Sequence, residues 1–196
     1  MIAPPERSAA RDAAIDAVLP IAATMGWTRE ALRQAAGPDA DILFPGGGAD
    51  MVEAYIDLAD RRMEEAGRLM PEPRLSKRVR ALLEARFLQA APHRDAVRRA
   101  ASLLAQPGHA LLAARCTART VDAIWHAAGD TSADFSWYTK RAILAAVYSA
   151  TLLHWMAPGT THEGTMEFLD RRLAGVARIG KLRARFTRPK AAPTAA

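Results

Sequence analysis

The chain has 196 residues, of which half are hydrophobic, a formal net charge of +6 at pH 7 and a single cysteine. This length and apolar content predict a folded protein with a sizeable core and exclude an intrinsically disordered chain. One cysteine excludes a disulfide framework and fits a reducing compartment. The first twenty residues contain acids and no apolar signal core, so we expect neither a secretory signal nor a transit peptide.

The positive charge is concentrated near the C-terminal end of the sequence. Residues 171–190 contain eight Arg or Lys and no Asp or Glu, whereas the rest of the chain contains 19 basic and 21 acidic residues. We therefore interpret the protein as a near-neutral globule with a basic C-terminal strip.

Apolar periodicity and capping residues predict helices along the whole chain, and alternating strand patterns are nearly absent. Ser8 is expected to cap a first helix that ends at Gly26, and Thr28 to cap a short second helix. Asp50 with Glu53 forms a capping-box pattern for a helix that reaches Ala66. Further helices are expected from Ser76 to Ala91, from Arg94 to Ala105, from Ala110 to Ala128, from Asp134 or Ser136 to Met156, and from Thr161–Glu163 into the basic tail.

These elements predict an all-α fold, a helical bundle of about eight or nine helices. We expect an N-terminal helix-turn-helix-like group in residues 1–66, a larger bundle in residues 74–175 and a basic tail in residues 176–196. A helix, then "GWTREALRQAAG", a short element and a longer helix follow each other as in a TetR-type DNA-binding domain. A TetR-type transcriptional regulator is therefore one hypothesis for the function.

The charges of that N-terminal group argue against a nucleic-acid partner. Residues 35–60 contain six acids and no Lys or Arg. A recognition helix in the major groove needs basic residues near the phosphates, and these six acids would repel them. We expect a repressor-like fold that does not bind DNA.

The sequence shows no catalytic constellation. Gly46–Gly48 is followed by neither a P-loop lysine nor a complete GxGxxG pattern, so a plain turn before a helix is expected. No Glu-x-x-His pair suggests a metal site, and Cys116 has no nearby sequence partner. We expect no catalytic residues, no metal and no cofactor, although a lipid-processing or metal-dependent enzyme stays as a third hypothesis.

The adjacent aromatic residues Trp137 and Tyr138 stand out at the start of an apolar helix. Neighbours on a helix point about 100° apart, so one buried face cannot take both rings. We expect one ring to pack inward and the other to stay near the surface. The following stretch, residues 142–157, is uncharged but at about 24 Å too short to cross a bilayer, which favours a buried helix or a dimer interface.

Five segments in order resemble the coenzyme Q "nine" family of ubiquinone-biosynthesis accessory proteins. They are "GWTREALRQAA", "LFPGGGADMVEAYI", "KRVRALLEARF", "VDAIWHAAGDTSADFSWYTKRAILAAVYSATLL" and "TMEFLDRRL", and they cover roughly residues 27–173. The resemblance implies a TetR-like fold without DNA binding and an apolar cavity for an isoprenoid lipid or phospholipid. It also implies a protein that performs no reaction itself and assists the di-iron ring hydroxylase of the pathway at the membrane.

The resemblance also implies a surface that faces the hydroxylase. Carried over position by position, this surface consists of Trp125, His126, Asp134, Trp137, Tyr138, Lys140 and Arg141. Large aromatic side chains beside arginine are typical of interface hot spots, which agrees with this assignment. The alternative is that both rings only wedge helix ends together.

A lipid pocket is predicted between the two apolar helices. The expected lining residues are Leu112, Val121, Ile124, Leu144, Tyr148, Thr151, Leu152 and Trp155. At helical spacing such a stripe is also compatible with ordinary core packing.

The basic strip is expected to contact a membrane. Val176, Ile179, Leu182 and Phe186 follow helical spacing and alternate with bases, so the predicted membrane-binding residues are Arg178, Lys181, Arg183, Arg185 and Phe186. A solvated tail is the alternative, because Gly175 and Gly180 weaken a helix. We expect a homodimer that is cytoplasmic and peripheral at the inner face of a bacterial cytoplasmic membrane.

Overall fold

The computed structural model describes residues 3–72, 74–130 and 136–186, with the side chains of residues 136 and 176–186 left out. These residues form eight α-helices and three short 3₁₀ helices and contain no strand, so the all-α prediction is confirmed. In chain order they are α1 (Ala9–Met25), α2 (Arg29–Ala36), η1 (Pro38–Leu43), α3 (Gly48–Arg68), α4 (Leu75–Ala90), η2 (Ala91–His93), α5 (Arg94–Leu104), η3 (Pro107–His109), α6 (Ala110–Ala128), α7 (Ser136–Met156) and α8 (His162–Phe186).

The first two helices begin where their capping residues predict. The side chain of Ser8 accepts a hydrogen bond from the backbone N–H of Arg11, and that of Thr28 accepts one from Ala31 at 3.1 Å. Each bond satisfies a backbone donor that the first turn of a helix leaves without a partner. The indole Nε1 of Trp27 donates to the carbonyl of Ala96 at 2.9 Å and ties this N-terminal group to α5.

One predicted cap is wrong. Helix α3 begins at Gly48, two residues before Asp50, and the Asp50 carboxylate bonds to Arg11 on α1 at 2.6 Å. A long-range ion pair therefore replaces the expected local capping box. Helix α4 begins at Leu75, one residue before its predicted start at Ser76, and has no side-chain cap.

The glycine run before α3 is a turn, as expected. Gly47 has a positive φ of 65°, which glycine adopts without steric cost. At Gly48 a Cβ atom would lie 2.2 Å from the carbonyl oxygen of Trp27, so no larger residue fits there. The turn thus packs α3 closely against the loop between α1 and α2.

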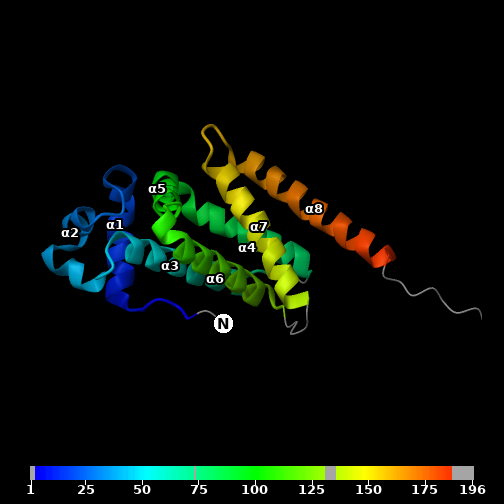
Figure 1. Ribbon diagram of the computed structural model, residues 1–196, viewed down its shortest axis with the longest axis horizontal. Coiled ribbons are helices and arrows are strands. Elements are labelled where there is room, and N and C mark those ends of the chain that lie inside the picture. Colours follow the sequence, from blue (N-terminus) through cyan, green and yellow to red (C-terminus); the bar gives the residue numbers. More distant parts are fainter. Residues whose placement is uncertain (1–2, 73, 131–135, 187–196) are drawn as a thin grey trace, which may run out of the picture.

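The larger bundle is built around α3, which packs against α6 and α4, and α7 packs against both α6 and α8. Figure 1 shows α1 and α2 at one end of the molecule and the α7–α8 hairpin at the other. Between α4 and α7 the rings of Phe87, Tyr148 and Trp155 form a buried cluster, with the Phe87 and Trp155 centroids 5.7 Å apart. Replacing a large side chain in such a cluster by a small one lowers the unfolding free energy, because the surrounding structure cannot fill the cavity that is left.

Five of the six acids in residues 35–60 are neutralised by arginine within the fold. The pairs are Asp41 with Arg33, Asp50 with Arg11, Glu53 with Arg119, Asp57 with Arg7, and Asp60 with Arg86. The premise that these acids present a free negative surface is therefore wrong, because each pairs with an arginine and four of the five partners come from distant parts of the sequence. The short element expected between the second helix and the longer helix is η1, a six-residue 3₁₀ helix between α2 and α3 that carries Asp39 and Asp41.

Helix α8 runs through the predicted start of the tail at residue 176 and continues to Phe186. Among the residues described, no helix is long and apolar enough to span a membrane. The domain boundaries proposed from the sequence stay predictions.

Candidate functional site

An apolar groove runs between α6 and α7. It has a volume of about 520 Å³ and is lined almost wholly by apolar atoms. Ligand pockets in proteins typically measure about 300–1,000 Å³ and combine an apolar wall with a few polar groups. We call it the α6–α7 groove; its lining residues are Ala114, Thr117, Ala118, Val121, Asp122, Trp137, Arg141, Ala142 and Ala145.

Trp137 and Arg141 close one end of this groove. The guanidinium carbon of Arg141 lies 3.7 Å from the Trp137 ring centroid, and its Nε donates to Asp122 on α6. The stacked pair is therefore fixed across the two helices by a cation–π contact and a charge-assisted hydrogen bond. Trp137 is half-buried, whereas Tyr138 packs edge-on against it and is 71% exposed. The two rings thus divide between interior and surface, as expected for neighbours on a helix.

A second, smaller apolar cavity lies on the other side of α7, and we call it the α7–α8 cavity. Its volume is about 250 Å³, and its lining residues are Ser76, Val79, Trp125, Lys140, Ile143, Leu144, Val147 and Leu173. The Nε1 of Trp125 is buried and has no hydrogen-bond partner. Lys140 lies 5.8 Å from the Trp125 ring and donates to Asp130 at 3.0 Å.

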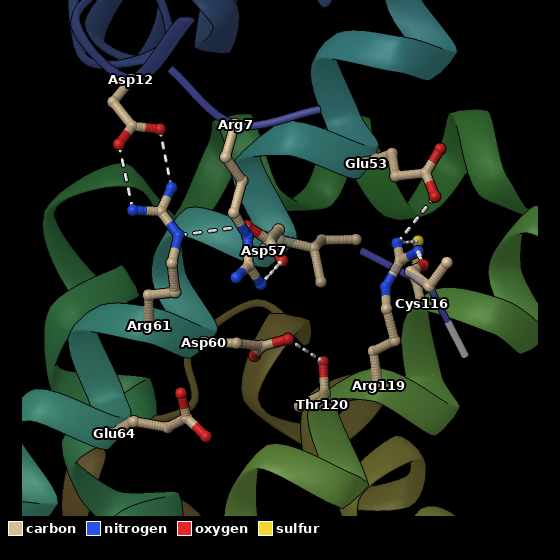
Figure 2. A network of polar contacts seen from close by, with 12 residues as sticks. Arg7, Asp12, Glu53, Asp57, Asp60, Arg61, Glu64, Cys116, Arg119 and Thr120 are labelled. Atoms are coloured by element: carbon tan, nitrogen blue, oxygen red, sulfur yellow. Dashed lines mark hydrogen bonds and ion pairs between the residues drawn. The ribbon is translucent and has the colours of Figure 1, made fainter. Parts of the chain in front are cut away.

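A polar cavity of about 480 Å³ adjoins the α6–α7 groove between α3, α6 and α7, and we call it the α3–α6 polar cavity. Figure 2 shows several of its side chains, which reach toward one another from α3, α6 and the N-terminal segment. Its walls share Asp122, Trp137 and Arg141 with the groove. Its other lining residues are Pro4, Arg7, Asp57, Asp60, Arg61, Glu64, Arg119, Ala123, His126 and Asp130.

Asp60 lies at the buried side of the polar cavity. It accepts a hydrogen bond from Thr120 at 2.9 Å and lies 3.1 Å from Arg86, yet burial raises its pKa to about 6 because the loss of solvent outweighs the attraction of Arg86. Burial likewise raises the pKa of Cys116 to about 11, so the thiol stays protonated at neutral pH. Cys116 is therefore a buried small residue and not an activated nucleophile.

The predicted partner-binding residues come together where α6 ends and α7 begins. Trp137, Arg141 and His126 line the polar cavity, Trp125 and Lys140 line the α7–α8 cavity, and Tyr138 projects outward beside Trp137. The Nδ1 of His126 lies 3.2 Å from Glu64 on α3. Asp134 lies outside the described residues.

Most of the predicted lipid-pocket residues lie elsewhere. Val121 lines the α6–α7 groove and Leu144 the α7–α8 cavity. Ile124, Tyr148, Thr151 and Trp155 are buried, and Leu112 and Leu152 are half-buried, but none of these six lines any of the three cavities described above. Phe87 from α4 packs against Tyr148 and Trp155, so these side chains belong to the solid core.

The residues that open the groove are small ones that the sequence analysis missed. Ala114 and Ala118 on α6 face Ala142 and Ala145 on α7. Alanines spaced three or four residues apart share a helix face, and two such faces opposite each other leave a channel between the helices. This alanine spacing was the available signal in the sequence.

The predicted membrane-binding residues Arg178, Lys181, Arg183, Arg185 and Phe186 lie on the last turns of α8. Their side chains lie outside the described part of the structure, so their contacts stay a prediction. Among the described residues no group of three or more His, Cys, Asp or Glu could hold a metal ion.

A comparison with solved structures identifies the class of fold. The structure is similar to the crystal structure of the TetR transcriptional regulator from Nitrosomonas europaea ATCC 19718, with a TM-score of 0.68 and 21% sequence identity over 86% of this chain and 98% of that one. At this identity the similarity shows the TetR-like fold and carries no functional conclusion.

The sequence comparisons show which proteins the chain is similar to. The COQ9 family model matches residues 110–180, which include α6, α7 and most of α8. The chain is 31% identical to the mitochondrial ubiquinone biosynthesis protein COQ9 of Rattus norvegicus, over 79% of this chain and 54% of that protein. It is 30% identical to that of Homo sapiens, over 85% of this chain and 57% of that protein. The chain is thus a TetR-like relative of the COQ9 proteins, the resemblance seen in its motifs is confirmed, and it spans a little over half the length of these relatives.

The same relatives contradict the expected location. Those of rat, human and Drosophila melanogaster are all named as mitochondrial proteins, which points to mitochondria and not to the inner face of a bacterial cytoplasmic membrane. The expectation rested on composition, and composition does not distinguish these compartments.

Proposed function

We propose that this protein is a non-catalytic lipid-binding accessory protein of ubiquinone biosynthesis that assists a ring hydroxylase. The observation that carries the proposal is the α6–α7 groove, an apolar channel of about 520 Å³ inside the segment that matches the COQ9 family model. The relatives are named as ubiquinone biosynthesis proteins, and the resemblance seen in the sequence implies a cavity that holds an isoprenoid lipid. An apolar groove lined largely by alanines suits such a lipid because nearly all of its surface offers van der Waals contact with apolar atoms.

The proposed hydroxylase-binding surface is the end of the same groove. Tyr138 offers a large exposed ring beside the charged side chains of Lys140 and Arg141. Aromatic and arginine side chains dominate the binding energy of many interfaces. Because Trp137 both lines the groove and contacts Tyr138, a bound chain would end directly beneath the partner.

The proposed membrane contact uses the last turns of α8. The helical backbone extends through residues 176–186, so the apolar positions of this segment fall on one face and its bases on the others. Attraction of anionic lipid headgroups contributes about 1 kcal/mol per base near the surface. This contact would place the groove close to the membrane that holds the isoprenoid substrates.

Filling the groove tests the proposal. Ala142 is an exposed residue that lines the groove, and Ala146, one turn further along α7, is exposed and does not line it. Ala142→Phe is expected to abolish lipid retention and to lower quinone yield when it replaces the wild-type protein in a deletion strain. The matched control Ala146→Phe is expected to retain both. Normal lipid retention by Ala142→Phe would contradict the proposed location of the lipid.

A further inference from the structure

The residues at the start of α7 differ in how much surface they offer to a partner. The Tyr138 ring is 71% exposed, Trp137 is half-buried, and the side chain of Arg141 is only 17% exposed. A partner that docks at this end of the bundle therefore meets Tyr138 directly. Arg141 has little surface of its own to contribute, so its contacts inside the protein indicate its role.

Asp122 holds Arg141 from the opposite helix. The Nε of Arg141 on α7 donates to the carboxylate of Asp122 on α6, while the guanidinium carbon lies 3.7 Å from the Trp137 ring centroid. A guanidinium donates within its plane and stacks through its face, so it can make both contacts at once. The carboxylate thus fixes the cation, and the cation fixes the indole.

The indole of Trp137 in turn orients Tyr138. The two rings meet edge to face, with centroids 4.7 Å apart and an interplanar angle of 75°. Helix α7 begins at Ser136, so both rings belong to its first turn. Side chains in a helix lean over the turn that precedes them, and residues of the first turn have no such turn to pack against. Contacts from elsewhere must therefore hold the rings, and the stack of Arg141 on Trp137 is one of them.

The order of these rings affects how tightly a partner binds. A flexible side chain that becomes ordered in an interface lowers the affinity roughly two- to tenfold. Without the charge of Asp122, Arg141 loses the charge-assisted hydrogen bond that fixes it. The rings of Trp137 and Tyr138 then gain rotamers in the free protein, and both must be ordered again when the partner binds.

We infer that Asp122 is a positioning residue of the proposed hydroxylase-binding surface, which holds Arg141 against Trp137 and so presents the Tyr138 ring in one orientation. The inference rests on the proposed function and adds a residue on α6 that is absent from the set implied by the family resemblance. Asp122 acts through Arg141 and not by contact with the hydroxylase.

The first test is the affinity for the cognate ubiquinone-pathway hydroxylase, measured by isothermal titration. Asp122→Asn keeps the size of the side chain and removes its charge; it is expected to raise Kd about 4- to 30-fold, because two rings lose their order. Asp122→Glu keeps the carboxylate and is expected to restore Kd to within about threefold of the wild-type value. The matched control is Asp16→Asn, which removes an ion pair with Arg62 between α1 and α3, at the other end of the molecule (Figure 1), and is expected to leave Kd unchanged.

A double-mutant cycle separates positioning from direct contact. In the Tyr138→Ala background the ring that Asp122 orients is gone, so Asp122→Asn is expected to change Kd less than about threefold there. The same fold-change in both backgrounds would overturn the inference, because Asp122 would then act independently of Tyr138. Loss of affinity in Asp122→Glu equal to that in Asp122→Asn would also overturn it.

A second test uses the free protein and needs no hydroxylase. In fluorine NMR of protein labelled with fluorotryptophan, Trp137→Phe identifies the Trp137 signal, and the buried Trp27 and Trp155 serve as internal references. Asp122→Asn is expected to shift and broaden the Trp137 signal and to leave those of Trp27 and Trp155 in place, whereas loss of the fold would move all of them. An unchanged Trp137 signal alongside normal wild-type binding would overturn the inference alone. A wild-type protein that does not bind the hydroxylase would overturn the proposed partner, and the role of Asp122 with it.

Discussion

Tyr138 offers the most direct test of the proposed hydroxylase-binding surface, because its ring is 71% exposed. A tyrosine that becomes buried contributes about 150–250 Å², so roughly 100–180 Å² of this side chain is available to a partner. At about 25 cal/mol per Å² this area corresponds to about 2.5–4.5 kcal/mol. After the cost of ordering the side chain, Tyr138→Ala is expected to lose about 2–3 kcal/mol of binding free energy, roughly a 30- to 150-fold rise in Kd.

The same substitution should leave the fold intact. In the free protein Tyr138 contacts Trp137 edge-on, with ring centroids 4.7 Å apart. Loss of this partly exposed pair is expected to cost no more than about 1 kcal/mol of unfolding free energy. For a chain of this size the loss corresponds to a fall in Tm of at most about 4 °C.

Isothermal titration of the cognate ubiquinone-pathway hydroxylase with wild-type and variant protein measures the effect on binding, and calorimetric melting measures the effect on stability. Leu153→Ala is the matched control, because Leu153 is 67% exposed near the other end of the same helix. Hydroxylase affinity equal to wild type in Tyr138→Ala would refute the partner-surface argument. So would an equal loss of affinity in Leu153→Ala.

Three further predictions concern the core, the buried acid and the C-terminal segment. Phe87→Ala should lower the unfolding free energy by about 3–5 kcal/mol in urea denaturation, because the ring is 2% exposed and packs on Trp155; a loss below about 1 kcal/mol would contradict the packed cluster. Asp60 has a folded-state pKa of about 6, above its usual value, so the folded protein binds more protons and its stability falls as pH rises from about 4 to 6. Between pH 4 and 6 the unfolding free energy of the wild-type protein should fall by up to roughly 3 kcal/mol relative to that of Asp60→Asn. A difference in urea midpoint between the two proteins that is the same at pH 4 and at pH 6 would exclude the pKa shift. Removal of residues 174–196 should weaken sedimentation with anionic liposomes at low salt and have little effect at high salt; unchanged sedimentation would remove this segment as the membrane contact.

The sequence was sufficient to predict the structure where that structure depends on residues close together in the chain. Ser8 and Thr28 cap their helices because the side chain bonds to a backbone donor three residues away. The capping box at Asp50 was predicted by the same reasoning and is wrong, since Arg11 binds that carboxylate from another helix. Such competition from distant residues cannot be read from local spacing.

In the candidate site, too, the features set by local helix geometry were predicted and those set by packing between helices were not. The outward position of Tyr138 and the inward position of Trp137 follow from helix geometry alone. The groove was missed because it depends on which alanines face each other after α6 and α7 pack. The predicted pocket residues Tyr148 and Trp155 proved to be core, since Phe87 on α4 contacts both of their rings.

The central claim is that the α6–α7 groove holds a lipid. Native mass spectrometry of the purified wild-type protein and of Ala142→Phe, followed by solvent extraction, tests it most directly. The account predicts a co-purifying isoprenoid quinone, quinone precursor or other lipid in the wild-type protein and none in the variant. A wild-type protein that carries no lipid and takes none up from liposomes would contradict it.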